Sequence, residues 1–242
     1  MKIKSSILSQ LSDLEHGFVL EPDLPPKDGL VCNQVHGTTI LDLKEPFSMD
    51  SQPSADGLIT TQPIAVYVLS ADCLPVLFSD RSGSIVAAVH AGWKGFLAGM
   101  LDVAIETFKK RGVQPKDLLA AIGPAIGPCC FEIDSSLSDQ FEQKFSSVIE
   151  KNKVEVSFFE QPRSIRSTTL PRAKPSGGDK KWLDLQTLGK LVLESHSLNE
   201  VELLNYCTYC SIKDGNRFES YRRSTHLGQK TGRLRSFIEI RR

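Results

Sequence analysis

Two short apolar runs, each leading to a side chain that can bind a metal ion, define the stretch from residue 66 to residue 95. Residues 66–69 (VYVL) lead to Cys73, and residues 85–89 (IVAAV) lead directly to His90. Runs of this length, rich in Val and bounded by turn residues, are typical of buried strands. Because ligands in α/β proteins collect beyond the carboxyl ends of strands, we expect a binding site where Cys73 and His90 lie.

A third candidate ligand follows the same pattern upstream, where residues 30–35 (LVCNQV) lead to His36. Two imidazoles and one thiolate are a recognised catalytic zinc set, with the fourth position left for water or substrate. A blue-copper site would also need a methionine close after its Cys and His, and none of the 3 methionines has that spacing. The sequence therefore favours zinc, bound by His36, Cys73 and His90.

The same residues also suit other kinds of protein. Cys73 can be a nucleophile and His90 its base, as in metal-free Cys–His hydrolases. Asp72, directly before Cys73, can be a hydrogen-bond acceptor, a general base or a polar turn residue, so Asp72, Cys73 and His90 are the candidate catalytic residues. A third interpretation is a non-catalytic metal-binding or regulatory protein.

Cationic side chains near these residues are candidates for binding an anionic substrate. A helix is predicted to begin near Trp93, and its free N–H groups would suit a phosphate or carboxylate. Lys94 lies in that first turn, either as a phosphate ligand or as a solvated surface lysine. Arg222 and Arg223 could clamp a phosphate through bidentate contacts, although arginines are also ordinary surface residues.

Residues 161–181 differ from the rest of the chain in their charge. Lys and Arg outnumber Asp so far that this segment carries a net charge of +5, and Pro and Gly recur within it. We predict a mobile surface loop, which is either a lid over an anionic substrate or a solvated insertion.

Strand-like and helix-like segments alternate along the chain. Its 242 residues, 40% of them hydrophobic, can bury one sizeable core, so we predict a single α/β domain over residues 1–242. The predicted strands are 58–61, 64–69, 75–79, 84–89, 118–122, 201–205, 218–221 and 236–240, and the predicted helices are 93–111, 134–150 and 182–197.

Charge and cysteine content exclude several classes of protein. A formal net charge of zero gives no general attraction to nucleic acid or to an anionic membrane. No run is long enough to span a membrane, and residues 1–17 lack the apolar core of a signal peptide, so we expect a cytoplasmic protein. The 6 cysteines are then thiols or metal ligands rather than disulfides. One or both cysteines of the C-x-x-C at 207–210 are interpreted as core residues. The adjacent Cys129 and Cys130 side chains are expected to diverge in an extended backbone and to share no chemistry.

Several short motifs carry a combined resemblance to a known family: NQVHG at 33–37, ADG at 55–57, ADCLP at 71–75, VHAGWKG at 89–95, GPAIGPCCFE at 123–132, SYRR at 220–223 and TGR at 231–233. Together they resemble the laccase-domain family, whose older name is the multi-copper polyphenol oxidase family. Its members are described as purine nucleoside phosphorylases. The resemblance runs from about residue 16 to the last residues of the sequence.

The resemblance implies a mixed sheet flanked by helices, as in the catalytic domain of cytotoxic necrotizing factor toxins. It implies zinc at His36, Cys73 and His90, phosphorolysis of adenosine, inosine, guanosine and methylthioadenosine, and deamination of adenosine. The expected partners are purine nucleosides and phosphate, and the expected assembly is a monomer or homodimer. A copper-dependent polyphenol oxidase is the alternative that the older family name suggests.

The sequence departs from the family pattern in one place. Family members usually carry an Arg-x-Gly-Gly-Val-Ser and a Ser-Leu-Asn-Leu segment between the His-Gly-Phe and the Gln-Val-His-Gly motifs. Here the HGF at 16–18 is followed almost directly by residues 19–31. The polar groups of the missing segments could help to bind substrate or phosphate.

Overall fold

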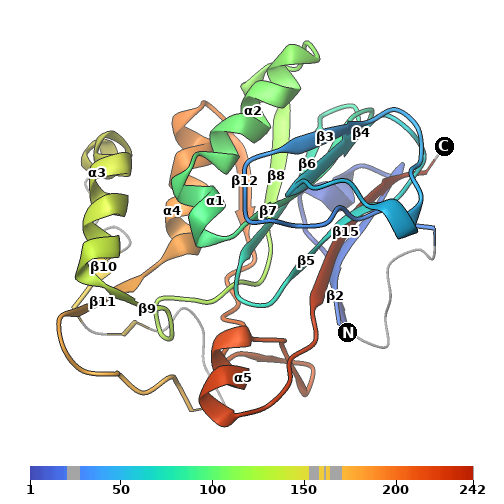
Figure 1. Ribbon diagram of the computed structural model, residues 1–242. Helices are drawn as coiled ribbons and strands as arrows, with labels where there is room; N and C mark the ends of the chain where they lie inside the picture. The colour runs from blue at the N-terminus through green and yellow to red at the C-terminus, as the bar shows by residue number, and fades with distance from the viewer. Residues whose placement is uncertain (21–27, 153–157, 161, 164–170, 242) are drawn as a thin grey trace.

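The computed structural model describes residues 1–20, 28–152, 158–160, 162–163 and 171–241 (Figure 1). The helices are α1 (Trp93–Leu97), α2 (Met100–Lys110), α3 (Ser135–Asn152), α4 (Leu185–Ser195) and α5 (Tyr221–Leu227). The strands are β1 (Lys2–Ile3), β2 (Leu14–Val19), β3 (Ile40–Leu43), β4 (Gly57–Thr60), β5 (Val66–Ser70), β6 (Leu74–Asp80), β7 (Val86–Ala91), β8 (Leu118–Ile122), β9 (Glu132–Asp134), β10 (Phe158–Phe159), β11 (Lys180–Leu183), β12 (Glu200–Leu203), β13 (Ile212–Lys213), β14 (Asn216–Arg217) and β15 (Leu234–Ile240).

A six-stranded mixed sheet forms the centre of the fold. Its strand order is β12-β8-β6-β7-β4-β3, with parallel pairs at the two edges and antiparallel pairs between them. Every residue of β4, β6, β7 and β8 is buried. These strands are continuous apolar runs because both faces of the sheet are covered, and this is the signal that the sequence carries.

Successive side chains of each central strand point into two different cores. Val76 and Phe78 of β6 pack with α1, α2 and α4 on one face, whereas Leu77 packs on the other face. That second face is covered by a four-stranded sheet of order β1-β2-β15-β5 (Figure 1). The result is three layers, with helices, the large sheet and the small sheet stacked in turn, which confirms the predicted α/β class with a mixed sheet.

The predicted helix at 93–111 is wrong in one respect, because it is two helices. Gly99 adopts a φ of 96° between α1 and α2, a conformation that only glycine takes without strain. The apolar periodicity continues across this break because both helices face the same core, with Phe96 and Met100 fully buried. Periodicity alone therefore cannot show where the axis changes direction.

The last predicted helix also begins later than expected. Trp182 belongs to β11 rather than to a helix at 182–197. Asp184 accepts a hydrogen bond from the Thr187 amide at 3.0 Å and caps α4, which begins at Leu185. An aspartate that precedes an apolar periodic run is typical of a helix N-terminus. Asp184 therefore marks the start of α4 better than the apolar Trp182, from which the prediction began the helix.

The predicted strand at 218–221 is wrong, because Tyr221 is the first residue of α5. The Ser220 side chain accepts from the Arg223 amide at 3.1 Å and so caps this helix. At the other end of the sequence, β2 was missed, since His16 and Gly17 interrupt its apolar pattern. β2 nevertheless lies between β1 and β15, where its residues are covered on both sides.

The predicted loop at 161–181 falls partly outside the described residues. Its last two residues are not loop, because Lys180 and Lys181 begin β11 and form ion pairs with Asp134 and Glu142. Among the described residues, the helices are either too short or too polar to cross a membrane.

Candidate metal-binding site

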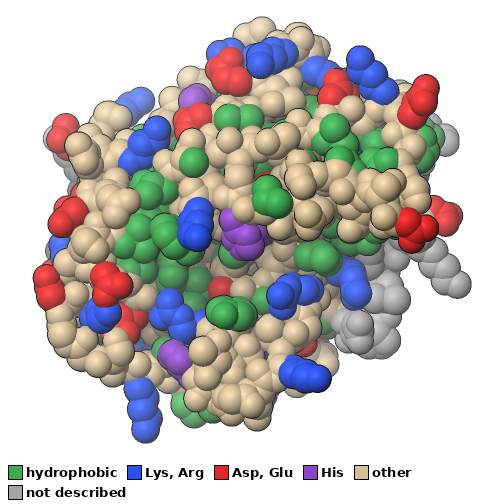
Figure 2. Space-filling model, viewed as in Figure 1, with side chains coloured by type: hydrophobic (Ala, Val, Ile, Leu, Met, Phe, Trp, Pro, Cys, Tyr) green, Lys and Arg blue, Asp and Glu red, His purple; other side chains and the backbone are tan. Residues whose placement is uncertain are grey.

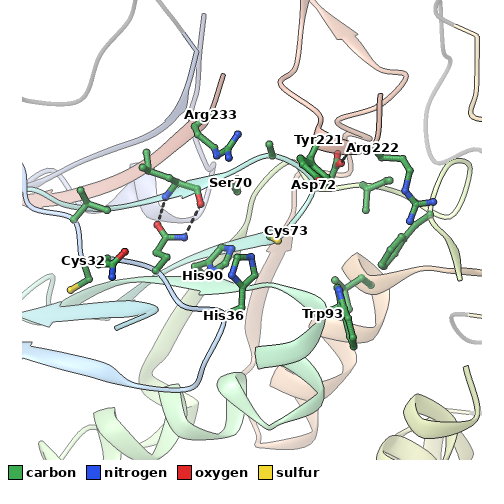
Figure 3. A pocket seen from close by; sticks show the side chains of 18 of the residues that line it. Cys32, His36, Ser70, Asp72, Cys73, His90, Trp93, Tyr221, Arg222 and Arg233 are labelled. Carbon is green, nitrogen blue, oxygen red and sulfur yellow. Dashed lines mark hydrogen bonds between the residues drawn. The ribbon is translucent and has the colours of Figure 1, made fainter. Parts of the chain in front are cut away.

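His36, Cys73 and His90 converge at one end of the two central strands, where β7 ends and β6 begins (Figure 3). Their ligand atoms all lie within 4.8 Å of one another, and the two imidazole rings are 4.9 Å apart in an edge-to-face arrangement. The predicted convergence is therefore present, but the strand-end argument explains only part of it. His90 is the next-to-last residue of β7, and Cys73 follows the end of β5 by three residues, both as expected. Residues 30–35, in contrast, form isolated bridges rather than a strand, so His36 lies in a loop before β3.

Antiparallel pairing brings two of these residues together. The start of β6 lies beside the end of β7, with Pro75 opposite His90. Cys73, two residues before Pro75, therefore reaches the side chain of His90. His36 approaches from a loop and adopts a φ of 61°, a left-handed conformation that is rare for a residue with a side chain.

Asp56 connects the His36 loop to His90. Its fully buried carboxylate accepts from the backbone amides of Val35, His36 and Gly37 at 3.2, 2.8 and 2.7 Å, and it contacts Nδ1 of His90 at 2.9 Å. Burial opposes its ionisation, yet the hydrogen bonds from His90 and from these amides lower its pKa. The carboxylate thus fixes the tautomer of His90 with Nε2 free for a metal ion.

Gly92 packs against the side chains of all three candidate ligands. A Cβ at this position would lie 2.8 Å from Cδ2 of His36 and 3.1 Å from Sγ of Cys73. The absent side chain is therefore what lets the ligands approach. Two imidazoles and one thiol are a borderline donor set that suits zinc, so the residues present fit a zinc ion.

The arrangement also resembles that of a Cys–His hydrolase, because His90 lies between the Cys73 thiol and the Asp56 carboxylate. Burial, together with the negative charge of Asp72, raises the pKa of Cys73 to about 12. Without a bound cation the thiol would stay protonated at neutral pH, which argues against a metal-free nucleophile.

A cavity of about 630 Å³ opens beside the three ligands, a size typical of small-molecule sites. On the face shown in Figure 2, a histidine side chain lies near the middle with Lys and Arg side chains around it. Aromatic groups of Trp93, Phe131 and Tyr221 line the cavity. Ser70 also lines it, and its buried Oγ has no hydrogen-bond partner within the described residues. These groups suit a planar apolar ligand with polar edges.

Asp72 lines the cavity but also holds two loops in place. Its φ is 93°, and its carboxylate accepts from the Thr208 hydroxyl and from the Arg222 amide, both at 2.6 Å. Burial raises the pKa of this carboxyl group. Because both oxygens are engaged, the visible role of Asp72 is to position Arg222 and the segment that contains Thr208.

The predicted cationic residues do not all reach the cavity. Arg222 lines it, with its guanidinium donating to the Glu132 carbonyl at 3.1 and 3.2 Å. Arg223 is directed elsewhere, because it donates to the carbonyls of Thr208, Tyr209 and Phe218.

Lys94 is exposed on α1 with its Nζ 5.5 Å from the Trp93 ring, next to the cavity but outside its lining. The sequence analysis missed Arg233, which lines the cavity opposite Arg222 and follows the TG of the last motif (Figure 3). Its place as the last residue of the TGR motif is the signal that could have marked it.

The chain matches the family described as multi-copper polyphenol oxidoreductase laccase over residues 17–241, and it belongs to this family. This confirms the resemblance carried by the motifs. A Pseudomonas aeruginosa protein named purine nucleoside phosphorylase is 34% identical over 211 residues, which cover 85% of this chain and 72% of the relative. An Escherichia coli protein with the same name is 33% identical over 215 residues, covering 88% of this chain and 74% of the relative.

Solved structures show the same fold. A Neisseria meningitidis protein is 30% identical with a TM-score of 0.67, and a Bacillus licheniformis protein is 27% identical with a TM-score of 0.68. Each match covers 88% of this chain and 74% of the other.

Proposed function

We propose that this chain is a zinc-dependent purine nucleoside phosphorylase that also deaminates adenosine. One observation carries the proposal: His36, Cys73 and His90 converge at the wall of a cavity of nucleoside size with aromatic sides. The names of the relatives supply the substrate class. The expected substrates are adenosine, inosine, guanosine and methylthioadenosine, with phosphate as the second substrate.

The cavity lining suggests how a purine nucleoside would bind. Trp93 and Tyr221 are 37% and 63% exposed, so their rings are free to stack on a planar base. The Ser70 hydroxyl, which has no partner in the described part of the chain, can donate a hydrogen bond to a polar edge of the ligand or accept one from it. This combination holds the nucleoside by stacking and orients it through a polar contact.

Arg222 and Arg233 supply positive charge to the same cavity and are our candidates for holding phosphate. Phosphorolysis requires the anion to attack the ribose anomeric carbon while the purine leaves with a proton, so positioning is the main need. When bound, zinc supplies Lewis acidity that suits the deamination as well. Lys94, beside the cavity, can guide the anion electrostatically to the mouth.

Product analysis with and without phosphate tests this proposal. Adenosine or inosine should yield free base and ribose 1-phosphate only when phosphate is present, and adenosine should also yield inosine. His90→Ala should abolish both reactions, whereas His196→Gln, at the end of α4 and outside the cavity lining, should leave them unchanged. Base release at the same rate without phosphate would contradict the phosphorylase assignment.

A matched pair of arginine variants separates the phosphate contact from general charge. Arg222→Ala should raise the KM for phosphate, and Arg217→Ala, an exposed arginine of β14 outside the cavity lining, should not. An equal effect of both substitutions would show that Arg222 acts only through the net charge.

A further inference from the structure

Four cysteines that the proposed reaction does not use meet in a second cluster. Their sulfur atoms all lie within 4.8 Å of one another, and none of these residues lines the cavity beside His36. All four side chains have no exposed surface. The cluster consists of Cys129, Cys130, Cys207 and Cys210.

The pairing of two edge strands explains how these residues meet. β8 and β12 are parallel neighbours, with Ile122 opposite Leu203, so the segments that follow them leave the sheet side by side. The pairing continues as a bridge between Ala125 and Cys207, and the Gly127 amide donates to Sγ of Cys207 at 3.3 Å. No local spacing in the sequence reveals this convergence.

Each segment then turns back and presents two sulfurs. The Cys130 amide donates to the Gly127 carbonyl at 2.9 Å, and the Ser211 amide donates to the Cys207 carbonyl at 2.9 Å. The expected divergence of Cys129 and Cys130 is therefore wrong, because it assumed an extended backbone and the backbone here is a turn. Sγ of Cys129 lies 3.5 Å from Sγ of Cys210, across the two segments.

The spacing of the sulfurs suits a single metal ion. Zn–S bonds of about 2.3 Å place the four sulfurs of a tetrahedral site about 3.8 Å apart, which agrees with the limit of 4.8 Å in the cluster. An iron–sulfur cluster would hold the thiolates further apart, because each of its irons carries its own thiolates. Four thiolates in a tetrahedron are typical of zinc among single ions.

The surroundings also suit the net negative charge of such a site. Arg223 donates to the carbonyls of Thr208 and Tyr209 at 2.9 and 2.6 Å, and these two residues lie between Cys207 and Cys210. The N–H group of Gly127 points at one sulfur. The Gly127 amide thus donates directly to one sulfur, and Arg223 fixes the backbone between two of the cysteines.

We propose that Cys129, Cys130, Cys207 and Cys210 bind one structural zinc ion that cross-links the segments after β8 and β12. With four protein ligands and no exposure, the site is closed to substrate. Its role is to hold the cavity wall: the Thr208 hydroxyl and the Ile126 amide both donate to Asp72, from the two linked segments. The assignment is independent of the proposed reaction.

Metal content of the purified full chain tests the assignment. Protein prepared with reductant should contain two zinc ions per chain by elemental analysis, one from each group of ligands. The double variant His36→Ala/Cys73→Ser should retain one zinc that resists EDTA, because the remaining site is buried. Replacing that zinc by cobalt should give the intense thiolate-to-metal absorption of a four-sulfur site. This variant leaves the four cysteines intact, so the test does not depend on a destabilised cluster.

The reciprocal variant and a matched control complete the experiment. Cys129→Ser/Cys210→Ser should lose one zinc and unfold at a lower temperature, whereas Cys32→Ser, a buried cysteine outside both groups, should keep both zinc ions. The proposal is overturned if the His36→Ala/Cys73→Ser variant contains no zinc, or contains iron instead. Mass spectrometry that finds a disulfide among the four cysteines of the purified protein would also overturn it.

Discussion

Gly92→Ala should weaken metal binding at His36, Cys73 and His90 without weakening the fold. The new Cβ would lie 2.8 Å from Cδ2 of His36, and ordinary van der Waals contact begins at 3.4 Å. The imidazole must therefore retreat by about 0.6 Å, which exceeds the roughly 0.5 Å within which a functional site tolerates displacement. The new methyl group cannot shift toward Cys73 instead, because its Cβ already lies 3.1 Å from the Cys73 sulfur.

The backbone itself accepts this substitution. Gly92 has a φ of −61° and a ψ of 157°, values that alanine adopts freely. The lower entropy of the unfolded chain without this glycine stabilises the fold by about 0.4–1 kcal/mol. This offsets the roughly 0.5–1 kcal/mol by which alanine is less favourable than glycine at the N-cap of α1. We therefore expect the melting temperature of the metal-free protein to change little.

The zinc dissociation constant, measured by competition with a fluorescent chelator, should rise about 10-fold to 100-fold, the range found when groups that orient metal ligands are disturbed. Gly112→Ala is the matched control, because Gly112 has a φ of 82° and no atom within 4 Å of its added Cβ. That variant should lower stability by about 1 kcal/mol and leave zinc affinity unchanged. Unaltered zinc affinity in Gly92→Ala would refute the idea that the ligands pack over this glycine.

Three further outcomes follow from other contacts. Asp56→Asn should reduce zinc affinity about 10-fold to 100-fold by the same chelator assay, since the amide cannot hold His90 as the carboxylate does. Ser220→Ala should lower stability by about 1 kcal/mol in urea unfolding and raise the KM for phosphate, because it removes the cap of α5 that presents Arg222. Burial lowers the pKa of His16 from 6.5 to about 4, so the unfolded state binds the proton more tightly between these pH values. Stability should fall by about 3 kcal/mol as pH drops from 6.5 to 4, and His16→Gln should flatten that part of the urea-measured profile.

The sequence predicts the central strands and the three metal-ligand candidates because those features are local. The apolar runs that become β7, β8 and β15 are buried on both faces or paired on both edges, and their composition shows it. Cys73 and His90 follow such runs closely. The break at Gly99 is harder to predict, since a glycine inside an amphipathic pattern does not reveal its φ.

Features that depend on distant residues were missed for a physical reason. The Asp-Gly at 56–57 indicated only a turn, yet Asp56 orients two metal-ligand candidates that are 20 and 34 residues away. The cysteine cluster joins residues 81 apart and depends on the pairing of β8 with β12. Strand order depends on the whole chain, so the spacing of residues along the sequence predicts neither arrangement.

The position of β15 determines when the cavity can become complete during synthesis. β15 lies between β2 and β5, pairing Arg235 with both Val19 and Leu69. Until residues 234–240 leave the ribosome, β5 has no neighbouring strand along its length in the small sheet, although His36, Cys73 and His90 have long been synthesised. The nascent chain therefore exposes an unpaired strand edge while the candidate metal ligands are already present, a state open to mispairing. Pairing of β15 with β2 and β5 covers that edge and ends the risk of mispairing.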